Sequence, residues 1–228
     1  DLSIRAKLLL TLLGIGGLSV GIMGWIGYSS ARQRLESEAL GRLAGVQANK
    51  ANAVEAYVED LRRQVVTTSK DDQTVRAMQK FRSAFRVLDA RNAAPIGGGT
   101  AAVRTYYEDE FGPRLEEGTG TDGAAASYVP EEGHIQYLQN KYIASNPHPV
   151  GEKDRLDRPG EGWEVYHVPH ARYHDAFRRL LHAFNHADLC LVEPDNGHVV
   201  YSVQKEVDFG TSLLDGPYRD SHLAEPLG

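Results

Sequence analysis

The feature that most constrains this chain is an uncharged, mostly apolar run over residues 8–28. As a helix, a run of this length spans the ~30 Å hydrocarbon layer of a bilayer. We therefore expect residues 1–28 to form a cytoplasmic end and a transmembrane anchor. Arg5 and Lys7 precede the run, and the preference of basic residues for the cytoplasmic side places residue 29 onward outside the cytoplasm. A cleaved signal peptide is the alternative, although its apolar region is normally only about 7–15 residues long.

Glycines recur at helical spacing within the expected anchor. Gly17 and Gly21 form a G-x-x-x-G pattern, in which small residues let two membrane helices approach closely. We predict that this face packs against a membrane protein partner or a second copy of the chain. The alternative is a sequence that merely tolerates glycine, which is common in membrane helices.

The chain after the anchor has the apolar spacing of helices. Residues 29–70 contain no proline and carry apolar residues three and four apart, which predicts one long stalk helix. In residues 71–228, similar patterns predict a helix capped by Asp71 or Asp72 and a second over residues 100–111 that Gly112-Pro113 ends. Two more are predicted over residues 131–144 and from Pro169 to about residue 185.

One β-hairpin is predicted near the end of the chain. Apolar runs at residues 189–192 and 199–203 flank the turn sequence Pro194-Asp195-Asn196-Gly197. Gly210 and Gly216-Pro217 then break regular structure, so the polar side chains beyond the hairpin are expected on a loop. The expected fold class is α+β: a single transmembrane helix, a long stalk helix, and a helical layer packed with a small antiparallel sheet.

Charge and chemical motifs exclude several classes of function. The net charge of −6 argues against a nucleic-acid partner, because phosphate backbones repel an acidic surface. Cys190 is the single cysteine and is expected to be a small buried apolar side chain. No nucleophile elbow, P-loop or dinucleotide fingerprint follows a predicted strand, so we expect no enzymatic activity and no cofactor.

Three histidines are the best candidate for a metal site. His170 and His174 are four residues apart on a predicted helix and could share an ion, with His167 nearby. No glutamate completes an H-E-x-x-H motif, so the histidines are expected to be structural and no metal is predicted.

The segment DLCLVEPDNGHVVYSVQKEVDFGTSLLDGPYRDSHLA, residues 188–224, resembles the hairpin and following loop of Cache-type, PAS-like sensor domains. These are extracytoplasmic parts of bacterial chemotaxis receptors, sensor kinases and membrane adenylate or guanylate cyclases. The resemblance extends through KYIASNPHPVGEKD at residues 141–154 and HARYH at residues 170–174, and covers most of the chain from about residue 47. Family members continue into the rest of the sheet, a second membrane helix and an output domain, so the module at residues 71–228 is expected to be truncated at its C-terminus.

The resemblance implies a non-enzymatic, periplasmic sensor module in the bacterial inner membrane that binds a small ligand, a partner protein or both. It implies a ligand cleft at the hairpin, with polar contacts from Tyr201, Lys205, Glu206, Asp208, Tyr218 and Arg219. The competing interpretation is that these side chains only pin the loop to the sheet. The alternative function is a structural accessory subunit of a larger membrane complex, such as a respiratory or photosynthetic one. Metal-dependent hydrolysis at the histidines is a remote third.

Overall fold

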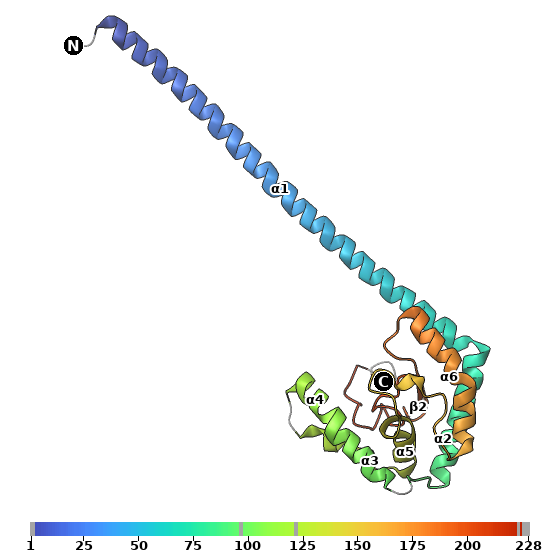
Figure 1. The fold of residues 1–228 in the computed structure, drawn as a ribbon. Helices are drawn as coiled ribbons and strands as arrows, with labels where there is room; N and C mark the ends of the chain where they lie inside the picture. The colour runs from blue at the N-terminus through green and yellow to red at the C-terminus, as the bar shows by residue number, and fades with distance from the viewer. Residues whose placement is uncertain (1–2, 96–97, 121–122, 223, 225–228) are drawn as a thin grey trace. The chain divides into compact units, whose positions relative to one another are not determined.

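The computed structural model describes residues 3–95, 98–120, 123–222 and 224. The chain divides into two units, Asp1–Thr68 and Ser69–Gly228. It is 67% helical, and its described residues contain only one two-stranded antiparallel sheet (Figure 1). The expected α+β class is therefore wrong, and the protein is mostly helical. The physical reason is that most of the buried apolar residues lie on helices and few lie on strands.

The first unit is formed by α1, Ile4–Lys70, which also supplies the first residues of the second unit. The segment Ile4–Gln33 of this helix is long and apolar enough to cross a membrane. A Cβ atom added at Gly17 or Gly21 would meet no atom within 4 Å. The absence of proline allows the predicted anchor and stalk to form one uninterrupted helix.

In the second unit, α2, Asp72–Ala90, starts at the predicted cap. The Asp71 carboxylate accepts hydrogen bonds from the backbone N–H groups of Gln73 and Thr74, at 2.9 and 3.2 Å. On the buried face of α2, Thr74 and Ala77 are buried, whereas the apolar Val75 is exposed. The other buried residues of α2 are Phe81, Ala84, Phe85 and Leu88.

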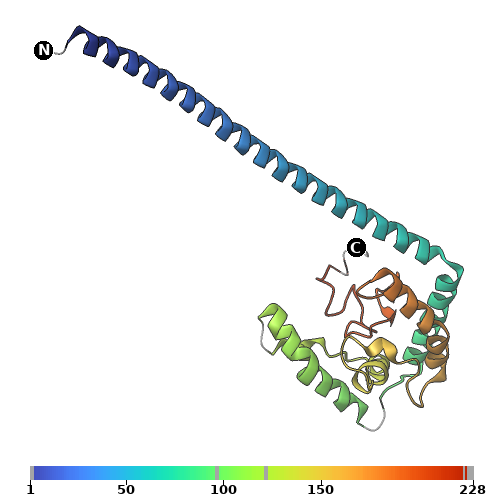
Figure 2. The ribbon, with the colours of Figure 1, turned by 45° about the horizontal axis from the view of Figure 1, so that its top comes forward.

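The next helix passes through the dipeptide that was predicted to end it. It comprises α3, Gly99–Tyr106, the π-helical segment η1, Tyr107–Phe111, and α4, Gly112–Thr119. Figure 2 shows these three segments as one continuous green helix. Pro113 lacks a backbone N–H, but the helix continues through it, so the predicted stop at Gly112-Pro113 is wrong.

Three short segments lead to the last helix. They are the 3₁₀ helix η2, Ala124–Tyr128, the helix α5, Gly133–Gln139, with its π-helical continuation η3, Asn140–Ala144, and the 3₁₀ helix η4, Lys153–Arg155. The last helix, α6, is Glu164–Phe184. The prediction that Pro169 begins this helix is wrong, because Pro169 lies inside it and is itself buried. The first turns of α6 carry Tyr166 and His167 into the core, and this packing holds the helix together upstream of the proline.

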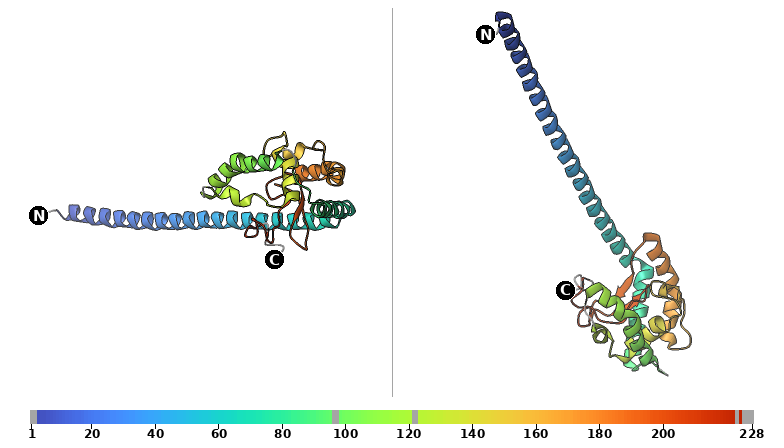
Figure 3. Two further views of the ribbon diagram at one scale, coloured as in Figure 1. Left: turned by 90° about the horizontal axis from the view of Figure 1, so that it is seen from below. Right: turned by 60° about the vertical axis from the view of Figure 1, so that its left-hand side comes forward.

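The predicted hairpin is present. Strands β1, Cys190–Val192, and β2, Val199–Ser202, pair antiparallel with Leu191 opposite Tyr201, and the register shifts between Leu191 and Val192. Gly197 has a φ of +71°, which glycine adopts readily in the turn. Figure 3 shows the short strands, drawn as orange arrows in its right-hand view, next to α2. After β2 the described chain continues mainly in turns, with one isolated bridge between His198 and Ser212.

The core of the second unit lies between α2, α5, α6 and the hairpin and is rich in aromatic residues. Phe81 of α2 contacts the rings of Tyr166, Tyr173 and Tyr201, with centroids 5.4, 6.3 and 4.5 Å away. The hairpin is also tied to α2 by charge, because Arg82 and Arg86 both contact the fully buried carboxylate of Glu193. These contacts hold the hairpin against α2.

Candidate functional site

A cavity of about 400 Å³ opens beside α5 and the first turn of α6. Its size is within the range of small-molecule sites. Trp163 provides an aromatic wall, and Tyr137, which is 3% exposed, is among the most buried of the lining residues. The lining is completed by Pro95, Asn140, Lys141, Glu161, Gly162 and Glu164. We call this space the Tyr137–Trp163 cavity.

A chain of hydrogen bonds runs from Tyr137 into the core. The backbone N–H of Trp163 donates to the Tyr137 hydroxyl at 2.7 Å, and this hydroxyl lies 2.9 Å from Nε2 of His167. Nδ1 of His167 lies 2.8 Å from the Tyr142 hydroxyl. His167 and Tyr142 are fully buried. Burial lowers the pKa of His167 to about 4, so its imidazole is neutral at pH 7.

The π-helical segment η3 makes this arrangement possible. Tyr137 and Tyr142 are five residues apart, and on an α-helix such residues point in different directions. The wider turns of a π-helix bring residues at this spacing toward one face, so both hydroxyls reach the same imidazole ring.

The backbone of Gly162 packs directly against the hydrogen bond between Tyr137 and His167. A Cβ atom at this position would collide with the Tyr137 hydroxyl and would lie 2.6 Å from Nε2 of His167. The backbone of Gly162 therefore approaches the Tyr137–His167 hydrogen bond as closely as only glycine can.

Polar groups without a full set of partners line the cavity. The Asn140 side chain is 8% exposed, and its amide oxygen accepts a hydrogen bond from Ser145 Oγ at 3.0 Å. The Asn140 amide nitrogen donates to no other described residue. The Lys141 ammonium donates to the Glu161 carbonyl at 2.6 Å and has no carboxylate partner in the described part of the chain. The carboxylate of Glu164, in contrast, is engaged by Arg158 at 2.6 and 2.5 Å.

A second polar cluster surrounds the buried ammonium of Lys205. This residue is fully buried and has a φ of +59°, and its Nζ donates to the Ser202 carbonyl and lies 4.5 Å from the ring centroid of Tyr201. Burial lowers the pKa of Lys205 to about 7. The described residues provide no carboxylate in direct contact with its ammonium group.

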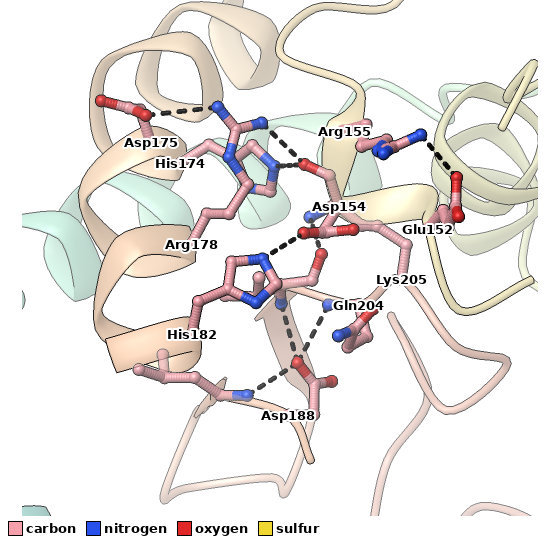
Figure 4. Close-up of polar contacts among 12 residues, drawn as sticks. Glu152, Asp154, Arg155, His174, Asp175, Arg178, His182, Asp188, Gln204 and Lys205 are labelled. Atoms are coloured by element: carbon pink, nitrogen blue, oxygen red, sulfur yellow. Dashed lines mark hydrogen bonds and ion pairs between the residues drawn. The ribbon is translucent and has the colours of Figure 1, made fainter. Parts of the chain in front are cut away.

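Near this cluster, side chains of α6 form hydrogen bonds with Asp154. Figure 4 shows His174, Arg178 and His182 converging on Asp154 of η4. Nε2 of His174 donates to the Asp154 carbonyl at 2.6 Å, so Nδ1 accepts from the Tyr201 hydroxyl at 2.7 Å. Burial lowers the pKa of His174 to about 3, which keeps this ring neutral.

The three candidate metal ligands all lie in the core but bond to different groups. His167 lies between two tyrosines, His170 donates from Nδ1 to the Asp157 carbonyl at 2.9 Å, and His174 bonds to Asp154 and Tyr201. The rings of His170 and His174 stack with centroids 4.3 Å apart. No group of three His, Cys, Asp or Glu side chains among the described residues has an arrangement that could hold a metal ion.

The six predicted ligand contacts do not share one cavity. Tyr201 and Lys205 contact each other in the core, whereas Glu206 lies 3.8 Å from Arg114. Asp208 is half-buried, and its pKa is raised to about 6, mainly by burial. The Tyr218 ring packs on Tyr128 with centroids 5.4 Å apart. Arg219 is the only one of the six that lines a separate groove of about 560 Å³, together with residues such as Glu131 and His198.

The residues of the Tyr137–Trp163 cavity were missed by the sequence analysis. Lys141 falls in a segment quoted for the Cache resemblance, and Trp163 follows a charged, glycine-rich stretch to which no function was assigned. The available signal was the sequence Gly160-Glu161-Gly162-Trp163, in which a large aromatic residue directly follows glycines. Its meaning depends on Tyr137, which is distant in the sequence.

No protein-family model, no curated protein and no solved structure matches this chain. The resemblance to Cache-type domains therefore stays an expectation from the sequence. The site has to be interpreted from its own geometry.

Proposed function

We propose that this protein is a non-enzymatic, membrane-anchored module that binds a small polar molecule in the Tyr137–Trp163 cavity. The observation that carries this proposal is the cavity itself, which is lined by the aromatic Trp163 and by the polar residues Tyr137, Asn140 and Lys141. Apolar walls with a few convergent polar groups are the usual composition of a ligand site. The proposed site therefore lies at the start of α6 and not at the hairpin.

The proposed topology follows from α1. The segment Ile4–Gln33 crosses the bacterial inner membrane once, with the N-terminal end in the cytoplasm and the second unit in the periplasm. Arg5 and Lys7 support this orientation. A sensor is the specific form of this proposal, in which the bound molecule alters a membrane partner or a second copy of the chain.

The second candidate function is a structural accessory subunit of a larger membrane complex. The observation that favours it is that Gly17 and Gly21 lie four residues apart on one face of the apolar segment of α1. Small residues on such a face allow close contact with another membrane helix. The two candidates differ in whether occupancy of the cavity matters.

The test is a thermal-unfolding screen of the full chain in mild detergent against a panel of organic acids, amides, amino acids and sugars. Glu161→Phe fills the mouth of the cavity, and Glu131→Phe makes the same change in the separate groove that Arg219 lines. We expect at least one compound to raise the Tm of the wild type and of Glu131→Phe but not of Glu161→Phe. A panel without effect, or equal effects on both variants, would refute the proposed site.

A further inference from the structure

The hydrogen bonds around His167 leave one proton without an acceptor. The chain of Tyr137, His167 and Tyr142 contains three protons, one on each hydroxyl and one on the neutral imidazole. Only two hydrogen bonds join these groups, and the described residues offer neither hydroxyl another acceptor. The Tyr137 oxygen also accepts from the Trp163 N–H, which adds a donor and not an acceptor.

The tautomer of His167 decides which proton is left over. With the proton on Nδ1, the imidazole donates to Tyr142 and accepts from Tyr137, and the proton of the Tyr142 hydroxyl is unpaired in the core. With the proton on Nε2, the imidazole donates to Tyr137 and accepts from Tyr142, and the proton of the Tyr137 hydroxyl is unpaired instead.

These two leftover protons are in different surroundings. Tyr142 is fully buried and lines no part of the Tyr137–Trp163 cavity, whereas Tyr137 lines it. A buried donor without an acceptor is destabilising, whereas one directed at the cavity can bond to whatever fills it. An acceptor in the cavity should therefore favour the Nε2–H tautomer by roughly tenfold or more.

We infer that the Tyr137 hydroxyl donates its proton to an oxygen acceptor of the molecule bound in the cavity, and that His167 then carries its own proton on Nε2. This inference rests on the proposed function and assigns the chemical class of the ligand. Tyr137 is the specificity-determining donor, and His167 is a positioning residue that turns the hydroxyl outward.

Two neighbouring donors extend this assignment. The Asn140 amide nitrogen has no acceptor among the described residues, and the Lys141 ammonium has no carboxylate partner there. Both residues line the same cavity as Tyr137. A carboxylate or an amide carbonyl satisfies these donors, whereas its apolar isostere leaves them unpaired. The planar part of the ligand is placed against Trp163.

Through the same hydrogen bonds, the molecule in the cavity affects the orientation of a hydroxyl in the core. An acceptor in the cavity orients the Tyr142 hydroxyl toward Nδ1 of His167, and an apolar occupant removes this preference. Tyr142 lies next to His170, with ring centroids 4.6 Å apart, and its ring centroid is 5.7 Å from Nζ of Lys205. The orientation of the Tyr142 hydroxyl beside the buried ammonium therefore depends on what occupies the cavity.

The first test is the tautomer itself, which needs no ligand because water in the cavity also accepts. The ring nitrogens of His167 are observed by ¹⁵N NMR in the labelled full chain in detergent at pH 7. They are assigned by their loss in His167→Gln and independently by contacts with the Tyr142 ring. We expect a protonated Nε2 and an accepting Nδ1. A protonated Nδ1 would mean that Tyr137 donates to His167, and it would overturn the inference even if the cavity binds ligands.

The second test uses benzoate, benzamide and toluene, which share a ring and differ in their acceptor oxygens. The indole N–H signal of Trp163 reports binding, and that of Trp25 in the membrane segment serves as the reference. We expect benzoate and benzamide to bind at least tenfold more tightly than toluene, and Tyr137→Phe to reduce this preference.

Each other outcome counts against the inference in a distinguishable way. Equal binding of all three probes, or an unchanged preference in Tyr137→Phe, would leave the cavity as a binding site and remove Tyr137 as the donor. No response of Trp163 to any probe would overturn the ligand class. If Tyr137→Phe fails to fold, the hydroxyl proton of wild-type Tyr137 is followed directly. It should shift with benzamide and not with toluene, and the same shift with both would refute the assignment.

Discussion

Replacement of Lys205 by methionine should stabilise the protein at neutral pH. The ammonium of Lys205 is fully buried, and burial lowers its pKa from 10.5 to about 7. Methionine keeps an unbranched side chain of similar length, and the backbone at φ +59° is equally unfavourable for both residues. Lys205→Met therefore removes the charge with little change in shape.

The magnitude follows from proton linkage. Between pH 7 and 10.5 the unfolded lysine binds more protons than the folded one, so the stability of the wild type rises with pH. The pKa shift corresponds to a loss of roughly 4 kcal/mol of stability at pH 7 and of roughly 1–2 kcal/mol at pH 9.5. We expect Lys205→Met to exceed the wild type in stability by about these amounts, with the difference shrinking as the pH rises.

Other titratable groups near Lys205 also affect how the stability of the wild type depends on pH. His170 and His174 are neutral throughout because their pKa values are lowered, and buried tyrosines such as Tyr201 have raised pKa values. Burial also raises the pKa of Cys190, whereas an unfolded cysteine ionises within this range, so stability has an opposing dependence there. Asp154 and Asp188 partly offset the burial of the ammonium. Because these groups occur in both proteins, the difference between the two proteins is the informative quantity.

The assay is denaturant unfolding of the full chain in mild detergent at pH 7 and 9.5, followed by tryptophan fluorescence. Lys80→Met is the control, because Lys80 is exposed and its replacement should change little at either pH. A Lys205→Met variant that is less stable than the wild type at pH 7 would refute the reasoning. So would a stability difference that does not change between the two pH values.

Three further predictions concern other parts of the chain. Gly162→Ala should lower the free energy of unfolding by about 2–4 kcal/mol in thermal unfolding, because the added Cβ atom collides with the Tyr137–His167 pair. At Gly160 an added Cβ atom would meet nothing within 4 Å, so Gly160→Ala is the control, and equal effects of the two variants would contradict the close packing. Glu193→Gln should lose about 2–3 kcal/mol, because Arg82 and Arg86 contact this buried carboxylate, and the exposed Asp195→Asn should lose less than about 1 kcal/mol; chemical denaturation that ranks them in reverse would refute this. Gly17→Leu with Gly21→Leu should keep membrane insertion and abolish helix association; unchanged co-purification and oligomeric state would assign docking elsewhere.

The features that could be predicted from the sequence depend on local interactions. The apolar run of α1 is long enough by itself to span a membrane. The cap at Asp71 needs only the next three residues, and the hairpin turn needs only the glycine that permits a positive φ at Gly197. Each of these features involves groups that are neighbours along the chain, so the local sequence is sufficient to predict it.

The incorrect predictions concern features that depend on contacts between residues distant in the sequence. Gly112-Pro113 was predicted to end one helix and Pro169 to begin another, but both helices continue through these residues. The turns that precede them are buried, through Tyr107 in the first helix and Tyr166 in the second, and burial of such side chains outweighs the loss of one backbone hydrogen bond. The mostly helical class was missed because the hairpin was interpreted, by resemblance, as part of a small PAS-like sheet.

The sequence by itself determined the long helix α1 with its possible membrane span, the boundaries of the hairpin and the acidic charge, because each depends on residue type and short spacing. Only the tertiary structure decided that Tyr137, Tyr142 and His167 form one hydrogen-bonded chain and that Gly162 covers it. It also decided that Lys205 is buried with no carboxylate of the described residues in contact with its ammonium group. Tyr137 and Tyr142 belong to α5 and η3, whereas His167 belongs to α6, and the relative positions of these elements follow from packing of the whole core. A π-helical turn then set the direction of the tyrosines, and no local propensity predicts such a turn.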